Sequence, residues 1–302
     1  MTFKHTPIKI VEHTYTHNDS EAFIIDENYT PPPNGVVVTK CRYTDRFHVY
    51  QNDNIIGAAL RLYGEYTQIE LDALDHFINE NTVVYDIGGN IGYHALGFSQ
   101  KAKHVHTFEP NIKNLQLLYL NVGTKSNVTI HEVACSDHAG TSYISDYDIN
   151  GLGNFGECML SDSGQPCKLV KIDDLGLPTP QVVKIDVEGH ELSVFNGMRN
   201  TITNSKPVIL YEAMHGTGFD LIYDFLHDEL GYTIYWFPAT NFNPNNFNKQ
   251  TMNVFGHGGV INCLAIPNTI NVTINGLELM TDRNDTHQKF IQRMIDKRGN
   301  NV

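Results

Sequence analysis

The sequence predicts an α/β protein with a mostly parallel sheet that carries helices on both faces. Two observations predict this fold. Apolar, β-branched segments alternate with amphipathic segments, and a glycine-rich turn joins one of the expected strands to the helix that follows it. The chain has 302 residues, of which 41% are hydrophobic and 18% are charged. This length and composition fit one large folded domain and exclude a disordered chain.

The alternation of elements begins at residue 66. Apolar residues recur there at helical spacing, Ile69, Leu71 and Leu74 among them. The expected helices cover residues 66–78, 91–99, 112–122, 192–198 and 219–229. The expected strands cover residues 82–86, 103–108, 128–133, 168–172, 181–187, 207–211, 232–237 and 259–266. A polar, glycine-rich interval at residues 146–165 interrupts the pattern.

We expect three parts along the chain. Residues 1–59 contain short β-rich runs and would form an N-terminal extension packed on the core. Residues 60–237 would form the α/β core. Residues 238–302 would form a C-terminal segment with a closing strand and a terminal helix.

Composition bounds the partners and the compartment. Lys and Arg number 21 against 34 Asp and Glu, and the net charge of −13 disfavours a nucleic acid held through its phosphates. The five cysteines are odd in number and include no C-x-x-C pair, which favours reduced thiols in the cytoplasm. The N-terminal residues lack the apolar core of a signal peptide, and no apolar run is long enough for a membrane span.

The strongest local signal is residues 83–98, where a strand ends at Asp86 and a turn containing Gly88, Gly89 and Gly92 leads into a helix. Such a turn lets a ligand approach the backbone at the crevice of an open α/β sheet. Glu109 ends the next expected strand, where a carboxylate can accept hydrogen bonds from a ribose. We therefore expect a nucleoside-containing cofactor.

The carboxylate of Asp86 distinguishes between two cofactors. An anion directly before the glycines would repel a pyrophosphate, whereas it suits the ammonium and sulfonium groups of S-adenosylmethionine. The segment also lacks the Gly-Lys-Ser/Thr of a nucleotide-binding P-loop.

A second polar motif covers residues 184–191, where a buried strand ends in Asp186 and a glycine turn starts a helix. Polar side chains at the carboxyl end of a strand beside the cofactor crevice can take a proton from a third molecule that meets the cofactor there. The candidate bases are Asp186, His190, Glu212 and His215. Alternatively, Asp186 and Glu212 could share a Mg²⁺ ion, although two carboxylates are a thin ligand set and we expect no metal.

Residues 235–259 interleave aromatic side chains with asparagines. Aromatic faces and amides together suit carbohydrate recognition, so residues 238–302 are a candidate acceptor-binding region; the alternative is a polar loop with anchoring aromatics. The Asn/Asp-Pro-Pro-Tyr/Phe signature of nucleic-acid methyltransferases is absent, because Asn245 follows Pro244.

The motifs DIGGNIGYHALGF, TFEPN and VVKIDVEGHELSVFNGM, with YGEYTQIELDAL upstream, together resemble the FkbM family of S-adenosylmethionine-dependent methyltransferases. The resemblance covers roughly residues 60–215. It implies a class I methyltransferase fold with a seven-stranded sheet whose last strand is antiparallel. It also implies O-methylation of an alcohol, here an acceptor that is a small molecule or a glycan, with a sugar hydroxyl expected.

The resemblance also implies a set of cofactor-binding residues. Asp86, Gly88 and Asn90 would line the methionine end of S-adenosylmethionine, and Glu109 would hold the ribose. The segment 63–67 would close over the cofactor. Two flanking pairs complete the set: Glu65 and Thr67 at the amino-acid portion, and Pro110 and Asn111 at the start of the helix beside the ribose. The alternatives are a nicotinamide-dependent oxidoreductase and a non-catalytic partner module in carbohydrate assembly.

Overall fold

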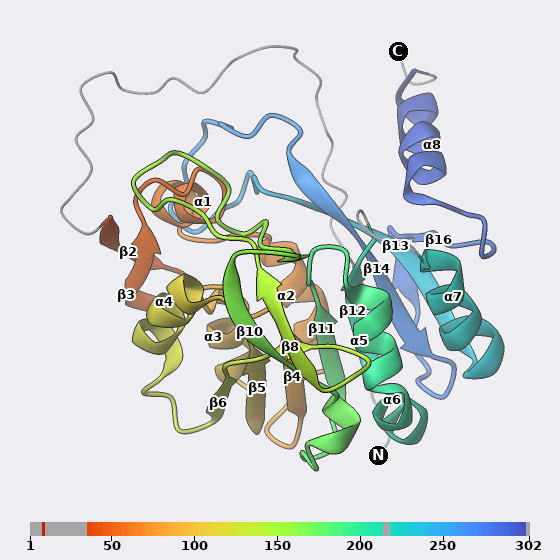
Figure 1. Cartoon of the computed structure of the whole chain (residues 1–302). Coiled ribbons are helices and arrows are strands. Elements are labelled where there is room, and N and C mark those ends of the chain that lie inside the picture. Colours follow the sequence, from red (N-terminus) through yellow and green to blue (C-terminus); the bar gives the residue numbers. More distant parts are fainter. Residues whose placement is uncertain (1–7, 10–34, 214–217, 300–302) are drawn as a thin grey trace.

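An eight-stranded mixed sheet runs through the centre of the protein (Figure 1). The computed structural model describes residues 8–9, 35–213 and 218–299. The strand order is β16-β13-β14-β12-β11-β4-β5-β6. The five strands from β12 to β6 pair in parallel, whereas β14 is antiparallel to both of its neighbours and β16 is antiparallel to β13. These strands are β4 (Val83–Ile87), β5 (His104–Phe108), β6 (Val128–His131), β11 (Val182–Ile185), β12 (Val208–Glu212), β13 (Tyr232–Thr240), β14 (Gly259–Pro267) and β16 (Glu278–Leu279).

Both faces of the sheet are covered, which explains why its central strands are apolar without interruption. Alternate residues of β4 and β12 enter different cores: Val84 and Leu210 pack on one face, Tyr85 and Tyr211 on the other. One face carries α1 (Ile56–Tyr63), α2 (Gln68–Asp75), α3 (Tyr93–Ser99) and α4 (Ile112–Val122). The opposite face carries α5 (Glu191–Gly197), α6 (Arg199–Ser205), α7 (Phe219–Tyr223), the π-helical turn η2 (Asp224–Glu229) and α8 (His287–Gly299).

Two smaller β structures flank the central sheet. The hairpin of β2 (Val36–Cys41) and β3 (Thr44–Tyr50) buries Phe47 and Val49 in the core beneath α1 and α4. A four-stranded sheet has the order β7-β10-β8-β9. Its strands are β7 (Ala134–Cys135), β8 (Gly140–Ile144), β9 (Leu160–Ser161) and β10 (Gln165–Val170). A short pair of β1 (Ile8–Lys9) and β15 (Ile274–Asn275) and a 3-10 turn, η1 (Ile172–Asp174), complete the elements.

The structure corrects the expected sheet in three respects. The central sheet has eight strands instead of seven, because the two-residue strand β16 adds to the edge of β13. The expected strand 168–172 corresponds to β10, which belongs to the smaller sheet. The closing strand β14 lies between β12 and β13, so the central sheet extends past residue 237.

The strand directions place the polar ends of several strands at one edge. The carboxyl ends of β4, β5, β11, β12 and β13 and the start of β14 all meet there.

All five cysteines are free thiols. Within the described residues, no helix combines the length and apolar character that crossing a membrane requires.

Candidate active site

A cavity of about 300 Å³ opens at this edge of the sheet. Its walls are the turns that follow β4, β5 and β11, the end of β12, the start of β14, and part of the connection between β8 and β10. Pockets for small molecules are typically about 300–1,000 Å³. The cavity therefore lies where open α/β sheets bind their ligands and has a suitable size.

The glycine turn after β4 forms the floor of the cavity. Gly88 has φ +90°, and a Cβ atom at this position would lie 1.8 Å from the backbone oxygen of Asp186. A Cβ atom at Gly89 would lie 2.0 Å from the side-chain oxygen of Thr107. Only glycine fits at both positions, and the turn therefore lies directly against the end of β11.

The backbone amides of residues 88–92 are all used within this region. The Gly88 and Gly89 amides donate to the Phe108 carbonyl at 3.0 and 2.9 Å. The Asn90 amide donates to the Glu109 carboxylate at 2.8 Å. The Ile91 amide donates to the side-chain oxygen of Asn90 at 2.7 Å, and the Gly92 amide donates to the Gly89 carbonyl at 2.9 Å. A turn that binds a pyrophosphate instead keeps such amides available for the phosphate oxygens.

Glu109 is 4% exposed and lines the cavity. Its carboxylate accepts hydrogen bonds from the amides of Asn90 and Asn111, each at 2.8 Å, and from the side chain of Asn114 at 3.4 Å. Burial raises its pKa to about 7, although the backbone hydrogen bonds oppose the shift. Two carboxylate oxygens have about four acceptor positions, so these three bonds leave capacity for a ligand hydroxyl.

The structure separates the other expected cofactor residues into two groups. Gly88, Asn90 and Pro110 line the cavity beside Glu109. Asn111 does not: it caps α4 by accepting from the backbone of residues 113 and 114.

Asp86 does not line the cavity either. Its side chain is fully buried, and one of its oxygens accepts from Thr107 at 3.1 Å. Burial is the main cause that raises its pKa, and Lys184 opposes the shift. Asp86 therefore lies behind the glycine turn and outside the cavity lining.

The segment before α2 also departs from the expectation. Glu65 and Thr67 lie outside the cavity lining, and Tyr66 between them lines it. Glu65 is 3% exposed, and Arg42, Asn243 and the Phe247 amide all donate to it. Because these donors use its carboxylate, the structure gives Glu65 a role in holding chain segments together.

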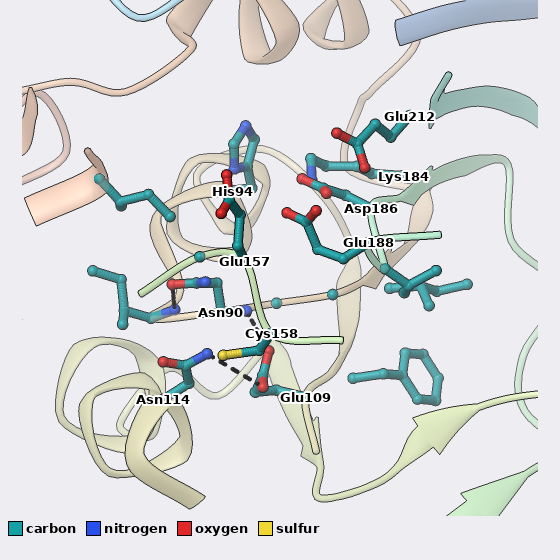
Figure 2. A pocket seen from close by; sticks show the side chains of 18 of the residues that line it. Asn90, His94, Glu109, Asn114, Glu157, Cys158, Lys184, Asp186, Glu188 and Glu212 are labelled. Atoms are coloured by element: carbon teal, nitrogen blue, oxygen red, sulfur yellow. Dashed lines mark hydrogen bonds and ion pairs between the residues drawn. The ribbon is translucent and has the colours of Figure 1, made fainter. Parts of the chain in front are cut away.

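A group of charged side chains occupies the end of the cavity formed by β11 and β12 (Figure 2). One oxygen each of Asp186, Glu188 and Glu212 lies within 4.8 Å of the others, and the Lys184 ammonium is 2.8 Å from Asp186. Among the described residues this is the one acidic or metal-ligating trio close enough to share a cation. Lys184 already supplies one positive charge to it.

These carboxyl groups have unusual titration behaviour. Burial first, and then the charge of Asp186, raises the pKa of Glu188 to about 8 and raises that of Glu212 further. Glu188 also has φ +52°, a left-handed conformation that costs a non-glycine residue energy. Strain and raised pKa values are typical of residues that take part in proton transfer.

The candidate bases included two histidines, and the structure describes one of them. His190 lines the cavity, and its Nε2 is 3.0 Å from the buried Ser136 hydroxyl. Burial lowers its pKa. His215 lies outside the described residues.

Sequence reasoning missed His94 as a cavity residue. His94 belongs to the first turn of α3, and its Nε2 is 3.0 Å from the carboxylate of Glu70. The Asn262 side chain donates to the other oxygen of Glu70 at 2.9 Å, which fixes that carboxylate. The polarity of His94 next to the glycine turn was the available signal, but its partner Glu70 is on another helix.

Aromatic side chains between residues 235 and 259 pack against other parts of the protein instead of lining the cavity. Trp236 is fully buried and donates to Asp285 at 3.0 Å, while Phe242 and Phe255 pack against Tyr63. From this region the cavity receives Asn241 and the backbone of residues 258–260.

The mixed α/β sheet with a cavity at its carboxyl edge agrees with the fold that the FkbM resemblance implies, and comparison with known proteins identifies the chain as a methyltransferase. The domain model described as the methyltransferase FkbM domain matches residues 86–234. The chain is also 34% identical over 173 residues to the hexuronic acid methyltransferase AglP of Haloferax volcanii, a match that covers 56% of this chain and 70% of that protein. The chain belongs to the FkbM methyltransferase family.

Two solved methyltransferase structures show a weaker similarity to the chain. The FkbM methyltransferase of Methylobacillus flagellatus KT has a TM-score of 0.42 and 18% identity, over 68% of this chain and 56% of that one. A precorrin-6y C5,15-methyltransferase from Geobacter metallireducens GS-15 has a TM-score of 0.43 and 16% identity, over 67% of this chain and 87% of that one. The chain thus spans little more than half of the length of the Methylobacillus protein.

Proposed function

We propose that the protein transfers the methyl group of S-adenosylmethionine to a hydroxyl group of a sugar or glycan. The observation that carries the proposal is a single cavity with Glu109 and the glycine turn at one end and Asp186, Glu188 and Glu212 at the other. The hexuronic acid methyltransferase relative supports a sugar as the acceptor.

The site suits a cationic cofactor. Glu109, Glu157, Asp186, Glu188 and Glu212 line the cavity, and Lys184 is the fixed cation among the lining residues. A positively charged ligand in this cavity favours the ionised form of Glu109, Glu188 and Glu212, whose pKa values are raised in its absence. The internally bonded amides of residues 88–92 favour this cofactor over one with a pyrophosphate, which argues against the nicotinamide-dependent alternative.

We assign the ribose to Glu109, with Gly88, Asn90 and Pro110 beside the cofactor and Asp86 behind the glycine turn. When bound, S-adenosylmethionine supplies an electrophilic methyl group on a positively charged sulfur. The chain must then hold the acceptor oxygen in line with that methyl group, because alignment provides much of the acceleration.

The acidic trio favours a hydroxyl as the reacting group. A carboxylate acceptor beside Asp186, Glu188 and Glu212 would be repelled, whereas a hydroxyl can donate its hydrogen to one of them. The carboxylate takes that proton as the new O–CH₃ bond forms. Lys184 holds Asp186 in place at 2.8 Å, and His190 stays a second candidate base.

Two measurements test the proposal. Calorimetry should show saturable binding of S-adenosylhomocysteine, and incubation with labelled methyl donor and a panel of glycosides should give a methyl ether detectable by mass spectrometry. Absence of cofactor binding would contradict the proposal, and formation of a methyl ester instead of an ether would contradict the hydroxyl assignment.

A further inference from the structure

Asn241 lies at the same edge of the sheet as the acidic trio. It follows Thr240, the last residue of β13, and its backbone amide donates a hydrogen bond to the Gly258 carbonyl at 3.1 Å. It lines the cavity together with residues 258–260 at the start of β14. Because β14 pairs with β12, this wall adjoins the end of the strand that carries Glu212 and is three strands away from β4, which bears the cofactor turn.

The side-chain oxygen of Asn241 lacks a hydrogen-bond partner among the described residues. The residue is 8% exposed, and its Oδ1 is buried without a hydrogen bond to any described residue. Buried polar atoms are almost always bonded, so an orphaned one in a residue that lines a cavity needs an explanation. A ligand that donates to this oxygen provides one.

Asn241 is also held firmly in place. The loop that it begins is tied down by the Glu65 carboxylate, which accepts from Asn243 and the Phe247 amide at 2.7 and 2.9 Å. The Tyr63 hydroxyl adds bonds to the backbone of residues 252 and 254, each at 3.0 Å. The backbone that carries the carboxamide is therefore organised before the ligand arrives, which lowers the entropy cost of binding.

We propose that Asn241 binds the acceptor sugar through a pair of neighbouring ring hydroxyls. This inference rests on the proposed function. A carboxamide offers one acceptor and one donor side by side, and two adjacent hydroxyls offer the complementary pair. The wall at the end of β13 and the start of β14 thus positions the pyranose while the acidic trio faces the reacting oxygen.

The test uses the protein saturated with S-adenosylhomocysteine and four probes: the methyl α-pyranosides of glucose, galactose, mannose and glucuronic acid. Binding is measured by saturation-transfer NMR and calorimetry. The wild type should bind at least one probe in the millimolar range, and Asn241→Ala should weaken it by about tenfold or more, the loss expected for a hydrogen-bonded hydroxyl pair. The matched control is Asn245→Ala, an exposed asparagine of the same loop, which should bind like the wild type.

Two controls separate binding from folding. Both variants should keep the wild-type affinity for S-adenosylhomocysteine, and Asn241→Ala should have an unchanged or higher Tm because it removes an unsatisfied buried group. Three outcomes would overturn this inference and leave the proposed function standing. They are a lower Tm of Asn241→Ala, unchanged sugar binding in Asn241→Ala, and a wild type that binds the cofactor but none of the probes. A wild type that does not bind S-adenosylhomocysteine would overturn the proposed function as well.

Discussion

The Glu65 carboxylate accepts a hydrogen bond from the side chain of Asn243 at 2.7 Å, although 178 residues separate the two. Arg42, from the β2–β3 hairpin, donates to the same carboxylate at 2.6 Å. One buried acid thus ties together the N-terminal hairpin, the segment before α2 and the loop between β13 and β14. That loop carries one wall of the cavity, so Glu65 supports the site from outside it.

The variant Glu65→Gln should separate this role from contact with the cofactor. Loss of the charge-assisted bonds to Arg42 and the loop should destabilise the protein by roughly 1–3 kcal/mol. The affinity for S-adenosylhomocysteine should stay within about twofold of the wild type, since Glu65 is not in the cavity lining. Urea unfolding and calorimetry measure the two effects. A large loss of cofactor affinity at full stability would restore the cofactor contact that the family resemblance implies.

Replacement of Glu109 by Ala should weaken S-adenosylhomocysteine binding by about 1.5–3 kcal/mol, because a charged hydrogen-bond acceptor for the ribose is lost. Calorimetry on Glu109→Ala and on the surface variant Glu80→Ala, whose parent residue is exposed, makes the comparison. Equal affinities for the two variants would reject the ribose assignment.

Gly88 and Gly176 form a matched pair for the backbone of the turn. Both have positive φ, but a Cβ atom at Gly88 would meet the Asp186 carbonyl at 1.8 Å, whereas one at Gly176 would have no atom within 4 Å. Gly176→Ala should cost about 1 kcal/mol from the backbone conformation alone. Gly88→Ala should cost several times more and should also abolish cofactor binding. Similar Tm values for the two variants would contradict the close approach of the turn to β11.

The stability of the cofactor-free protein should fall as the pH rises from about 6.5 to 8, above the range in which the lowered pKa values of His106, His131 and His190 act in the opposite direction. The pKa values of Glu109 and Glu191 are raised to about 7, and that of Glu188 to about 8, from an ordinary 4.5. In this window the unfolded chain has lost these protons while the folded protein keeps them, so stability present below pH 4.5 is lost as each folded-state pKa is passed. Urea unfolding at several pH values measures the slope.

Glu212→Gln extends this test to the acidic trio. The substitution removes a carboxyl whose pKa is raised by burial and by Asp186. The variant should therefore lose less stability than the wild type between pH 7 and 9. A slope equal to that of the wild type would show that Glu212 does not share in the repulsion.

The acidic trio should function without a metal ion, because the Lys184 ammonium already neutralises part of its charge at 2.8 Å from Asp186. Calorimetry with Mg²⁺ and Mn²⁺ should detect no saturable binding below about millimolar concentration, and an excess of EDTA should leave methyl transfer unchanged. Tight binding of either ion that is lost in Asp186→Asn would identify the trio as a cation site.

The parts of the site that sequence predicted are those whose chemistry is local in the chain. The glycine turn and Glu109 each follow a strand whose apolar pattern is clear, so their place at the carboxyl edge could be inferred. Asp86 belongs to the strand itself and lies outside the cavity lining. The two-residue strand β16 has too short a pattern to be detected. Likewise β8, whose residues 140, 141 and 143 are exposed, lacks the apolar signal of a buried strand.

Contacts between distant segments account for the rest. The expectation for Glu65 failed to include Asn243 and Phe247, because nothing in their own segment points to that partner. The pairing of His94 with Glu70 joins two helices. The asparagine-rich loop shows no sign in sequence that its aromatic residues pack against Tyr63 while Asn241 lines the cavity. Which side of a loop faces a cavity depends on the packing around it.

The insertion of β14 between β12 and β13 has a consequence for synthesis of the protein. Until residues 259–267 have left the ribosome, β12 has only β11 beside it and β13 lacks its main neighbour, so both expose backbone groups that can pair with other chains. A C-terminal truncation near residue 240 should thus aggregate rather than yield a smaller working enzyme.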